Sequence, residues 1–577
     1  MKLPYLENGN MNRKGIIQFK GLNQREVIEE GEFSAMENLS GALAPVFSPR
    51  EKRRICHRFD NPHGLIGKDH LLWADGPYLY YNGLKVGDVQ DNDKTFVGMA
   101  GYVVIYPDQL IFNTADHSLT KMNHHFTSAG QVTYTLCDET GKSYDYVVAH
   151  EPPESPENGA YWLDVSLENA SLKQYSGYLE DWQNVLTTYV KIGASGIGSG
   201  FKPLDGVKMT GSVLESLAVN EQEGTYVVLQ ATGEDFVVVI GMVNGEEQQE
   251  TPITLERTAP DMDMVIEANN RLWGCSSKNH EIYASKLGDP TNWQVFEGKA
   301  TDSYAATIES DGAFTGIFGY LGMVLFFKEH HLHKAVSSSW PPHIASMPVS
   351  GVQAGCEKSL ALVGQTLFYK SLDGVMAYSG GLPQLVSMRL GTKEYRRAVA
   401  GGIGYQYYLS MEEAATGKWG LFVYDLLTDL WHREDGTKVK WFARCVSDLF
   451  FIGEDNVLYA VTRNQKAMTF AQGVDEEDVH WQGDTGDLLQ LYPDHQFISK
   501  LQLKADIPEG GELEVWLSAK EGEWKRVYSY ENKGEKRGIT IPITPVRSNY
   551  LKLRLKGRGQ VKLYCLYKLV EQGSELG

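Results

Sequence analysis

The feature that most constrains this chain is a recurring pair of apolar runs joined by a polar turn. About seven copies occur: "HLLWADGPYLYYNG", "YVVIYPDQLIFN", "RLWGCSSKNHEIYASKL", "MVLFFKEHHLHKAV", "TLFYKSLDGVMAYSG", "YQYYLSMEEAATGKWGLFVYD" and "LFFIGEDNVLYAVT". Successive turns lie roughly 35 to 50 residues apart, the spacing of four-stranded propeller blades. The two runs would be the middle strands of a blade, which are apolar because neighbouring blades cover both faces. The pattern predicts an all-β fold with a β-propeller of about seven blades. The alternative is a set of unconnected hairpins in several sandwiches.

The spacing has one large exception. About 170 residues separate the turns at Asp108 and Asn279, so we expect an inserted β domain between two repeats. The insert has its own strand-like runs, and Asn244-Gly245 is a strong two-residue hairpin turn. From about Trp481 the pattern changes to strict alternation, as in "NYLKLRLKGRGQVKLY". Such alternation is typical of a half-buried sheet and predicts a C-terminal β-sandwich.

These patterns divide the chain into five predicted parts. They are an N-terminal arm at 1–60, the first propeller blades at 61–122, an inserted β domain at 123–262, the remaining blades at 263–475 and a β-sandwich at 476–577. The arm is mixed in composition, contains prolines and ends in a basic run. We interpret it as an extended segment that packs on the body or on a partner subunit, and a solvated linker is the alternative.

Four aromatic residues are predicted to pack between blades. Trp273 and Tyr283 lie on the two runs of one hairpin. Tyr424 and Trp431 follow the paired Gly401-Gly402 in a blade that resembles the kelch type. The glycines would allow tight packing, and the tryptophan would cover the turn of a neighbouring strand.

Charge and cysteine content exclude several classes of protein. The formal net charge of -20 argues against a general nucleic-acid-binding surface, although an acidic wall could let DNA slide past without sticking. The six cysteines are far apart and form no CxxC pair, which favours buried free thiols over a disulfide framework or a zinc site. The N-terminus lacks an apolar signal core, and no run reaches the length of a membrane span. We therefore expect synthesis in the cytoplasm and no contact with a membrane.

No motif identifies a catalytic site. The glycine-rich "GASGIGSG" at 193–200 lacks the Gly-Lys-Ser/Thr ending of a phosphate-binding loop. His331 and His333 would share one face of a strand, but no third metal ligand can be named, and surface imidazoles are the simpler interpretation. Asp261 and Asp263 could bind calcium, although such pairs more often mark the polar start of a strand. We expect a protein that is not an enzyme, with no cofactor and no metal.

Several stretches together resemble a family of propeller-type virion proteins. They are "NNRLWGCSSKNHEIYASKLGDPTNW", "ATDSYAATIESDGAFTG", "VLFFKEHHLHK", the N-terminal "GLNQREVIEEGEFSAMENLSGALAPVFSPR" and the C-terminal "PVRSNYLKLRLKGRGQVKLY…VEQGSE". The family is that of the head-to-tail stabilisation or tail nozzle proteins of phages and prophages. The resemblance covers most of the chain, is weakest in the insert, and implies no active-site residues.

The resemblance implies a structural protein of the virion tail. It would form a homo-oligomeric ring, six-fold in symmetry, that contacts other tail and connector proteins and encloses a conduit for DNA without sequence-specific binding. The basic residues at the end of the arm would then be candidate contacts to a neighbouring ring or to sister subunits; they are Arg50, Lys52, Arg53 and Arg54.

Two other functions fit the same pattern. A carbohydrate-binding or glycan-processing propeller, such as a tail adhesin, would offer exposed aromatic rings to a sugar, and Trp293, Trp340 and Trp431 would be the residues to examine. A kelch-like interaction scaffold would be a monomer with no association with phage particles.

Overall fold

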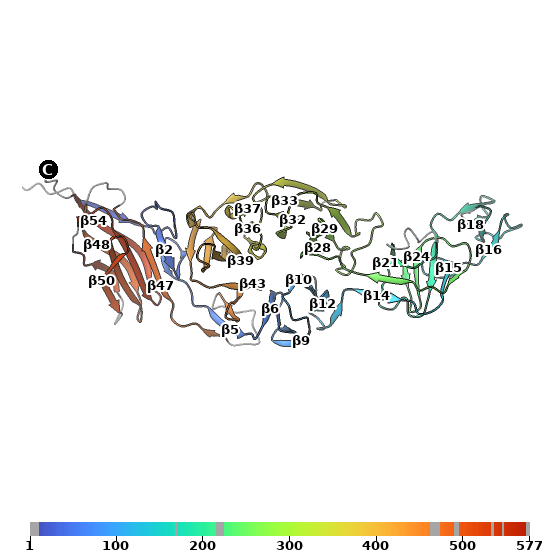
Figure 1. Cartoon of the computed structure of the whole chain (residues 1–577), viewed down its shortest axis with the longest axis horizontal. Helices are drawn as coiled ribbons and strands as arrows, with labels where there is room; N and C mark the ends of the chain where they lie inside the picture. The colour runs from blue at the N-terminus through green and yellow to red at the C-terminus, as the bar shows by residue number, and fades with distance from the viewer. Residues whose placement is uncertain are drawn as a thin grey trace, which may run out of the picture. The chain divides into compact units, whose positions relative to one another are not determined.

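The computed structural model describes residues 11–167, 170–214, 224–337, 339–461, 473–489, 496–531, 536–544 and 547–572. These residues form strands in twelve sheets and two short 3-10 helices, Glu357–Ser359 and Met388–Leu390 (Figure 1). No helix among them is long and apolar enough to span a membrane. The chain divides into two compact units, one formed by Met1–Asp93, Phe327–Leu332 and Ser346–Gly577 and the other by Lys94–Phe326 and His333–Ala345. The fold is an all-β propeller with an inserted β domain and a C-terminal sandwich.

The first unit contains four blade sheets of antiparallel strands. In three of them the strands follow one another in the chain, and in the fourth the N-terminal strand β5 lies between β45 and β46. Their strands are β6 (Pro62–Gly67), β7 (Leu71–Asp75), β8 (Tyr78–Tyr81) and β9 (Leu84–Asp88); β35 (Ala361–Val363), β36 (Thr366–Ser371), β37 (Gly374–Tyr378) and β38 (Gln384–Leu385); β39 (Tyr395–Ile403), β40 (Gln406–Glu413), β41 (Trp419–Asp425) and β42 (Leu430–Arg433); and β43 (Val439–Cys445), β44 (Asp448–Gly453), β45 (Val457–Ala460), β5 (Arg54–Arg58) and β46 (Val474–Asp475).

The second unit contains two sheets of the same kind, and the described residues contain one more. The two are β10 (Thr95–Met99), β11 (Tyr102–Tyr106), β12 (Leu110–Asn113) and β13 (Leu119–Lys121), and β27 (Met264–Ala268), β28 (Arg271–Ser276), β29 (Glu281–Ala284) and β30 (Tyr304–Thr307). The additional sheet consists of β31 (Gly316–Tyr320), β32 (Met323–Lys328), β33 (His331–Val336) and β34 (His343–Pro348). The described residues thus contain seven blade-like sheets, while the number of blades in a closed propeller stays a prediction.

The apolar runs of the sequence are the middle strands of these sheets. All six residues of β28 are buried, and so are all six of β44. A strand is buried in this way only when other layers cover both of its faces. The hairpin pattern therefore predicted both the strands and their burial.

In the second unit, Trp273 and Tyr283 lie in two different apolar clusters. The Trp273 side chain is fully buried with Phe326 of the next sheet, their ring centroids 6.4 Å apart. Tyr283 packs with Val97 and Met99 of the sheet that contains β10. Each aromatic ring thus joins its own sheet to another one.

In the first unit, Tyr424 and Trp431 pack together at 5.0 Å between ring centroids. Tyr424 also lies 5.5 Å from Phe368 of β36, which belongs to another blade. The indole N–H of Trp431 donates a 2.9 Å hydrogen bond to the carbonyl of Val386, just after β38. Both residues therefore lie between the β35–β38 blade and the β39–β42 blade.

The N-terminal strand β5 completes a blade made from the far end of the chain. It pairs antiparallel with β45, with Tyr459 opposite Ile55 and Ala460 opposite Arg54. Three strands of this sheet come from residues 439–460, and the fourth comes from residues 54–58. Backbone hydrogen bonds between β45 and β5, which are distant in sequence, thus complete the sheet of this blade.

The C-terminal sandwich also takes strands from the N-terminus. One sheet has the order β3-β4-β54-β48-β51 with β1 on β54 and β52 on β48, and the other has the order β2-β47-β53-β49-β50. Their bounds are β1 (Met11–Ile16), β2 (Phe33–Glu37), β3 (Leu39–Leu43), β4 (Val46–Pro49), β47 (His480–Thr485), β48 (Gln496–Ile507), β49 (Glu512–Lys520), β50 (Glu523–Glu531), β51 (Lys536–Ile541), β52 (Arg547–Ser548), β53 (Lys552–Arg558) and β54 (Lys562–Gln572).

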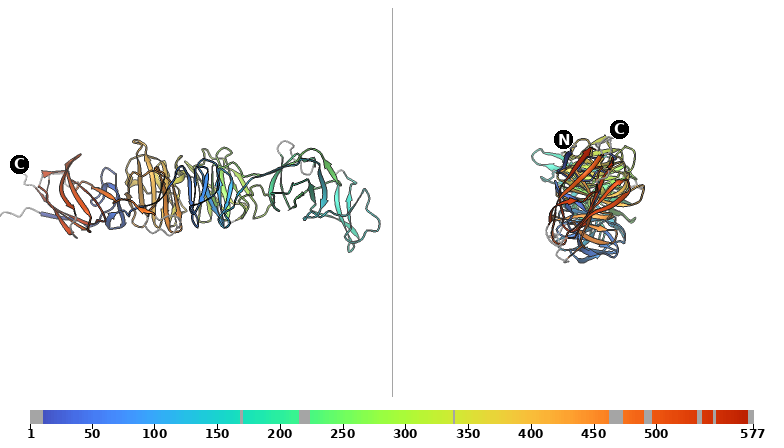
Figure 2. Two further views of the ribbon diagram at one scale, coloured as in Figure 1. Left: turned by 90° about the horizontal axis from the view of Figure 1, so that it is seen from below. Right: turned by 90° about the vertical axis from the view of Figure 1, so that its left-hand side faces the viewer.

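The blue N-terminal strands lie beside the red C-terminal strands (Figure 2). The described part of the arm, from residue 11 onward, is therefore built into two folded bodies, and the alternative of a solvated linker is wrong for it. The alternation expected after Trp481 is observed, since Leu553 and Leu555 are fully buried while Arg554 between them is not.

The insert begins and ends on paired strands. Its first strand, β14 (His124–Thr127), pairs antiparallel with its last, β26 (Thr254–Arg257). It contains three sheets, with orders β14-β26-β21-β22, β23-β24-β20-β15-β25 and β16-β17-β18-β19. The remaining bounds are β15 (Val132–Cys137), β16 (Tyr146–Ala149), β17 (Tyr161–Asp164), β18 (Ser171–Ser176), β19 (Asp181–Asn184), β20 (Tyr189–Gly193), β21 (Gly206–Thr210), β22 (Thr225–Val228), β23 (Ala231–Thr232), β24 (Phe236–Ile240) and β25 (Glu247–Gln249).

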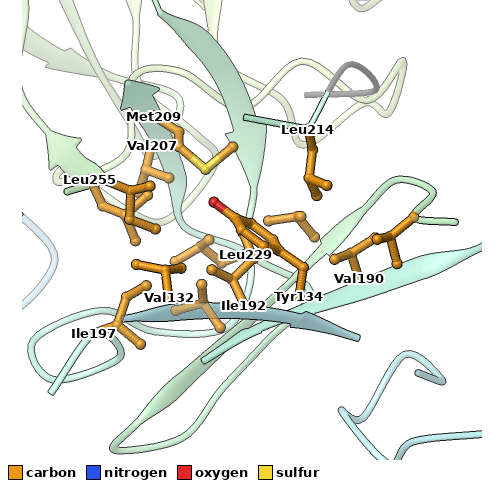
Figure 3. Packing of buried hydrophobic residues seen from close by; sticks show 14 of the residues in the cluster. Val132, Tyr134, Val190, Ile192, Ile197, Val207, Met209, Leu214, Leu229 and Leu255 are labelled. Atoms are coloured by element: carbon orange, nitrogen blue, oxygen red, sulfur yellow. The ribbon is translucent and has the colours of Figure 1, made fainter. Parts of the chain in front are cut away.

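The insert has its own apolar core. Figure 3 shows Val207 and Met209 of one sheet across from Tyr134 of another, within one cluster of buried side chains. The hydroxyl of Tyr134 donates a hydrogen bond to the side-chain oxygen of Gln249, so the polar end of this buried ring has a partner. All six cysteines of the chain are free, and five of them are buried.

Replacing Trp273 tests the packing between sheets. Trp273→Ala should lower the free energy of unfolding by about 3 to 5 kcal/mol, because it removes a fully buried ring and leaves a cavity. Urea unfolding followed by fluorescence and circular dichroism measures this loss. Tyr178→Ala is the control, since its side chain is 94% exposed and should change stability by less than about 0.5 kcal/mol. A loss near zero for Trp273→Ala would contradict its place in the core.

Candidate functional site

The basic run at the end of the arm lies in a buried network of ion pairs. One guanidinium nitrogen of Arg53 lies 2.6 Å from Glu434 and the other 2.8 Å from Asp435. Arg50 forms an ion pair with Glu476 and lies 3.7 Å from Glu434. Only 7% of Arg50 and 5% of Arg53 are exposed. The network joins the segment before β5 to the loop after β42 and to the segment after β46.

The other two residues of the basic run lie nearer the surface. The ammonium group of Lys52 is 2.6 Å from Asp478. The guanidinium group of Arg54 donates a 2.8 Å hydrogen bond to the carbonyl of Gly473. All four cationic side chains of the run therefore contact residues of their own chain. Their role as contacts to a partner stays a prediction that no observation tests.

The carboxylate of Asp435 shows how this network affects protonation. Burial alone would raise its pKa, but the charge of Arg53 and the hydrogen bonds from Thr437 and Arg53 outweigh this effect. The pKa of Asp435 is therefore below its ordinary value. A buried carboxylate held in this way stays ionised and supports the fold by its charge.

The N-terminal stretch that carries the family resemblance supplies further contacts. Glu32 is buried and accepts hydrogen bonds of 2.7 Å from the side chain of Asn23 and from the backbone N–H of Glu29. Phe33 is fully buried, with its ring centroid 5.3 Å from that of Phe19 and 5.8 Å from that of Phe47. The "GEF" residues thus belong to the core of the sandwich.

Asn38 in the same stretch lies at a sharp turn of the backbone. Its φ of 54° is in the left-handed region, which asparagine tolerates better than most residues. Its side chain donates to the carbonyl of His480 at 2.9 Å and accepts from Arg50 at 2.8 Å. One asparagine therefore connects the sandwich strand β47 to the buried ion network.

Backbone hydrogen bonds join the segment before β2 to the β39–β42 blade and to the 3-10 helix Met388–Leu390 that precedes it. The N–H of Leu22 donates to the carbonyl of Trp431 at 2.7 Å, and that of Gln24 donates to the carbonyl of Arg389 at 2.7 Å. Addition of a Cβ to Gly21 would place it 2.6 Å from the carbonyl oxygen of Trp431. We call residues 19–58, which make these contacts, the N-terminal clasp.

The histidines and aspartates considered as metal ligands have other roles. His333 is buried and its Nε2 lies 2.9 Å from the hydroxyl of Ser310, so the expectation of a surface imidazole is wrong for it. Asp263 accepts a 2.7 Å hydrogen bond from the backbone N–H of Ser277. Across the described ranges, no group of three His, Cys, Asp or Glu side chains could hold a metal ion.

The glycine-rich loop is part of the insert. Ile197 at its centre is fully buried, and the N–H of Gly196 donates a 2.7 Å hydrogen bond to the carboxylate of Asp235. The amide of Gly196 thus already binds an anionic group, the carboxylate of Asp235. These contacts hold the loop on the core of the insert.

The tryptophans considered as a sugar platform are covered. Trp293 is 3% exposed and Trp431 is fully buried. Trp340 is partly buried, and the guanidinium carbon of Arg271 lies 3.7 Å from the centre of its ring. The expectation of exposed stacking faces is therefore wrong for Trp293 and Trp431.

Sequence reasoning did not identify the acidic residues of the ion network. They are Glu434, Asp435 and Glu476. The one available signal was the opposite charge of "PREKRR" near the N-terminus and of "HRED" and "VDEED" near the end of the propeller region. Many other acidic stretches in this chain carry the same signal, so charge alone could not select these three.

Comparisons with known proteins do not place the chain in a family. No family model matches it, and no curated protein matches it. Among solved structures it is similar to Hsv2p of Kluyveromyces lactis, with a TM-score of 0.24 and 13% identity over 45% of this chain and 88% of the other. It is also similar to an exo-β-1,3-galactanase from Phanerochaete chrysosporium, with a TM-score of 0.22 and 9% identity over 53% and 94%.

A third similar structure is PorZ, a surface component of the type-IX secretion system of Porphyromonas gingivalis. Its TM-score is 0.26, with 10% identity over 83% of this chain and 70% of that chain. At these values none of the three likenesses carries an argument about function.

Removal of one charge should disrupt the clasp. Arg53→Met should lower the free energy of unfolding by about 3 to 5 kcal/mol, because it leaves Glu434 buried without its main partner. Chemical denaturation of the full chain measures the change. Arg444→Met is a matched control, since Arg444 is exposed and its replacement should be nearly neutral. Equal stability of the two variants would contradict a stabilising role for the buried pair.

Acidic pH should weaken the ion pair between Arg53 and Asp435. Since the folded-state pKa of Asp435 is lowered, its contribution is fully present above the unfolded pKa of about 3.9 and is lost as the pH falls through the folded value. Asp435→Asn should cost about 1.5 to 3 kcal/mol at pH 7, and the difference from the wild type should shrink below about pH 4. Urea unfolding at pH 7, 5 and 3.5 tests this. A difference that stays constant with pH would show that the charge is irrelevant.

Proposed function

We propose that this chain is a structural protein of a phage or prophage virion, a subunit of a ring at the tail nozzle or the head-to-tail junction. The observation that carries the proposal is the N-terminal clasp. The stretch that resembles the virion family, from Gly31 to Arg50, supplies strands, core side chains and buried charges. The residues on which the N-terminal resemblance rests thus have structural roles in this chain.

The clasp suits a protein that carries mechanical load. β5 pairs with β45 on one side and with β46 on the other, and Arg50 and Arg53 fix the segment before β5 to acidic residues that follow β42 and β46. Pulling the blade edge away would break a row of hydrogen bonds and expose buried charges together. A ring that remains closed while DNA moves through it needs resistance of this kind.

The net charge of the chain agrees with a role as a conduit. At -20, a ring of such subunits would repel the phosphates of DNA where its acidic residues face the lumen. DNA would then pass without sequence-specific binding. The other parts of the proposal are a homo-hexamer, contacts to neighbouring tail and connector proteins, and a location in the virion tail.

Particle composition tests this function. We expect purified particles from an induced culture of the source to contain this protein in a fixed ratio to the portal protein, because ring symmetry sets the number of copies. Quantitative mass spectrometry of peptides from both proteins gives the ratio. A ratio near one half, one or another simple multiple supports a ring subunit.

The control is the same preparation from an uninduced culture, which should contain neither protein. Absence of this protein from particles that contain portal protein would overturn the proposal. In that case, a carbohydrate-binding propeller would become the leading hypothesis. Its sugar site could not then consist of the buried rings of Trp293 and Trp431.

A further inference from the structure

A cavity of about 490 Å³ lies beside the β35–β38 and β39–β42 blades of the first unit. Its inner lining includes the buried side chains of Lys370, Val375 and Met411. Its outer lining includes Leu385, which is 41% exposed, and Met388, which is 62% exposed. The cavity thus combines a charged interior with an apolar entrance.

Lys370 differs from two other buried lysines, Lys94 and Lys568, in the groups around its ammonium ion. Only 3% of it is exposed, and no carboxylate of the described residues lies within ion-pair distance of its ammonium group. By contrast, the ammonium group of Lys94 lies 2.6 Å from Asp108, and that of Lys568 lies 2.6 Å from Glu30. Burial of an ammonium ion without an opposite charge is costly.

The hydrogen bonds of Lys370 offset only part of the free-energy cost of burying its ammonium group. Its ammonium group donates to the side-chain oxygen of Gln353 at 2.7 Å and to the carbonyl of Ser371. An ammonium group has three protons, and these two neutral acceptors use two of them. Burial lowers the pKa of Lys370, and the opposing effects of Cys356, Asp373 and Glu394 do not restore it.

Charged residues of both signs also line the cavity. Lys393 and Arg396 line the cavity together with Asp373 and Glu394. The carboxylate of Asp373 accepts a hydrogen bond from Ser350. Counting Lys370, the lining has three cations and two acidic residues in a chain whose overall charge is strongly negative. Lys393 and Arg396 already form ion pairs with Glu413 at 3.2 Å and with Glu412 at 3.3 Å. Lys370 is therefore the cation of the lining that an incoming carboxylate would meet.

We infer that this cavity binds a small carboxylate with an unbranched apolar body, of the size of a medium-chain fatty acid. The carboxylate accepts the third proton of Lys370 and supplies the missing opposite charge. The apolar body lies against Leu385 and Met388 at the entrance. This binding site is independent of the proposed virion function and would exist in a propeller with any other role.

Octanoate is the probe for the test, with the full chain titrated by calorimetry at pH 7. We expect saturable binding at one site per chain. Acetate lacks the apolar body and octan-1-ol lacks the charge, so each should bind at least about tenfold more weakly. Equal binding of octanoate and octan-1-ol would contradict a role for the charge.

The variant Lys370→Met removes the ammonium group and keeps an unbranched side chain. The acceptors of this ammonium group are neutral oxygen atoms, so its removal leaves no buried carboxylate without a partner, and we expect this variant to fold. Its affinity for octanoate should fall by about ten- to a hundredfold. Lys418→Met is the control, because Lys418 is exposed and lies outside the cavity lining. Unchanged affinity in Lys370→Met would overturn the inference.

A second measurement uses the wild-type protein and remains decisive if the variant does not fold. Trinitrobenzenesulfonate modifies unprotonated amines, and mass spectrometry of peptides gives the rate of modification at Lys370 and at Lys418. Octanoate should slow the modification of Lys370 at least severalfold and leave that of Lys418 unchanged. No selective protection of Lys370 at saturating octanoate would refute binding in this cavity.

Discussion

The pairing of β5 with β45 is the contact on which the rest of this structure depends. A propeller blade buries its middle strands only when an outer strand and neighbouring blades cover them. Here the strand beside β45 comes from residues 54–58, whereas β45 itself lies at residues 457–460. Because the segment before β5 also carries Arg50 and Arg53, hydrogen bonds and buried charges hold the blade together.

The same segment links two bodies that the sequence presents as separate. Strands β1 to β4 complete the sandwich, and β5 completes the blade a few residues later. Asn38 lies between them and contacts both His480 of the sandwich and Arg50 of the ion network. The N-terminal segment thus contributes to the sandwich, to the blade and to the ion network at once.

Buried charge is used in two different ways in this protein. In the clasp, each arginine faces carboxylates of the same chain, which supply the opposite charge. In the cavity, Lys370 has only neutral oxygen atoms around its ammonium group. The first arrangement is complete in one chain and contributes to stability. The second arrangement favours a ligand with a negative charge, which is why the cavity is the stronger candidate for a binding site.

The sequence alone determined the local structure of this protein. Apolar runs around polar turns predicted the middle strands, such as β28 and β44, because burial on both faces requires a continuous run of apolar residues. Alternation of apolar and polar residues after Trp481 predicted the sandwich, because only one face of each strand is buried there. Only the tertiary structure decided the partners of the N-terminal residues. Arg53 and Glu434 are 381 positions apart, and no local pattern encodes a contact that exists only once the chain closes on itself.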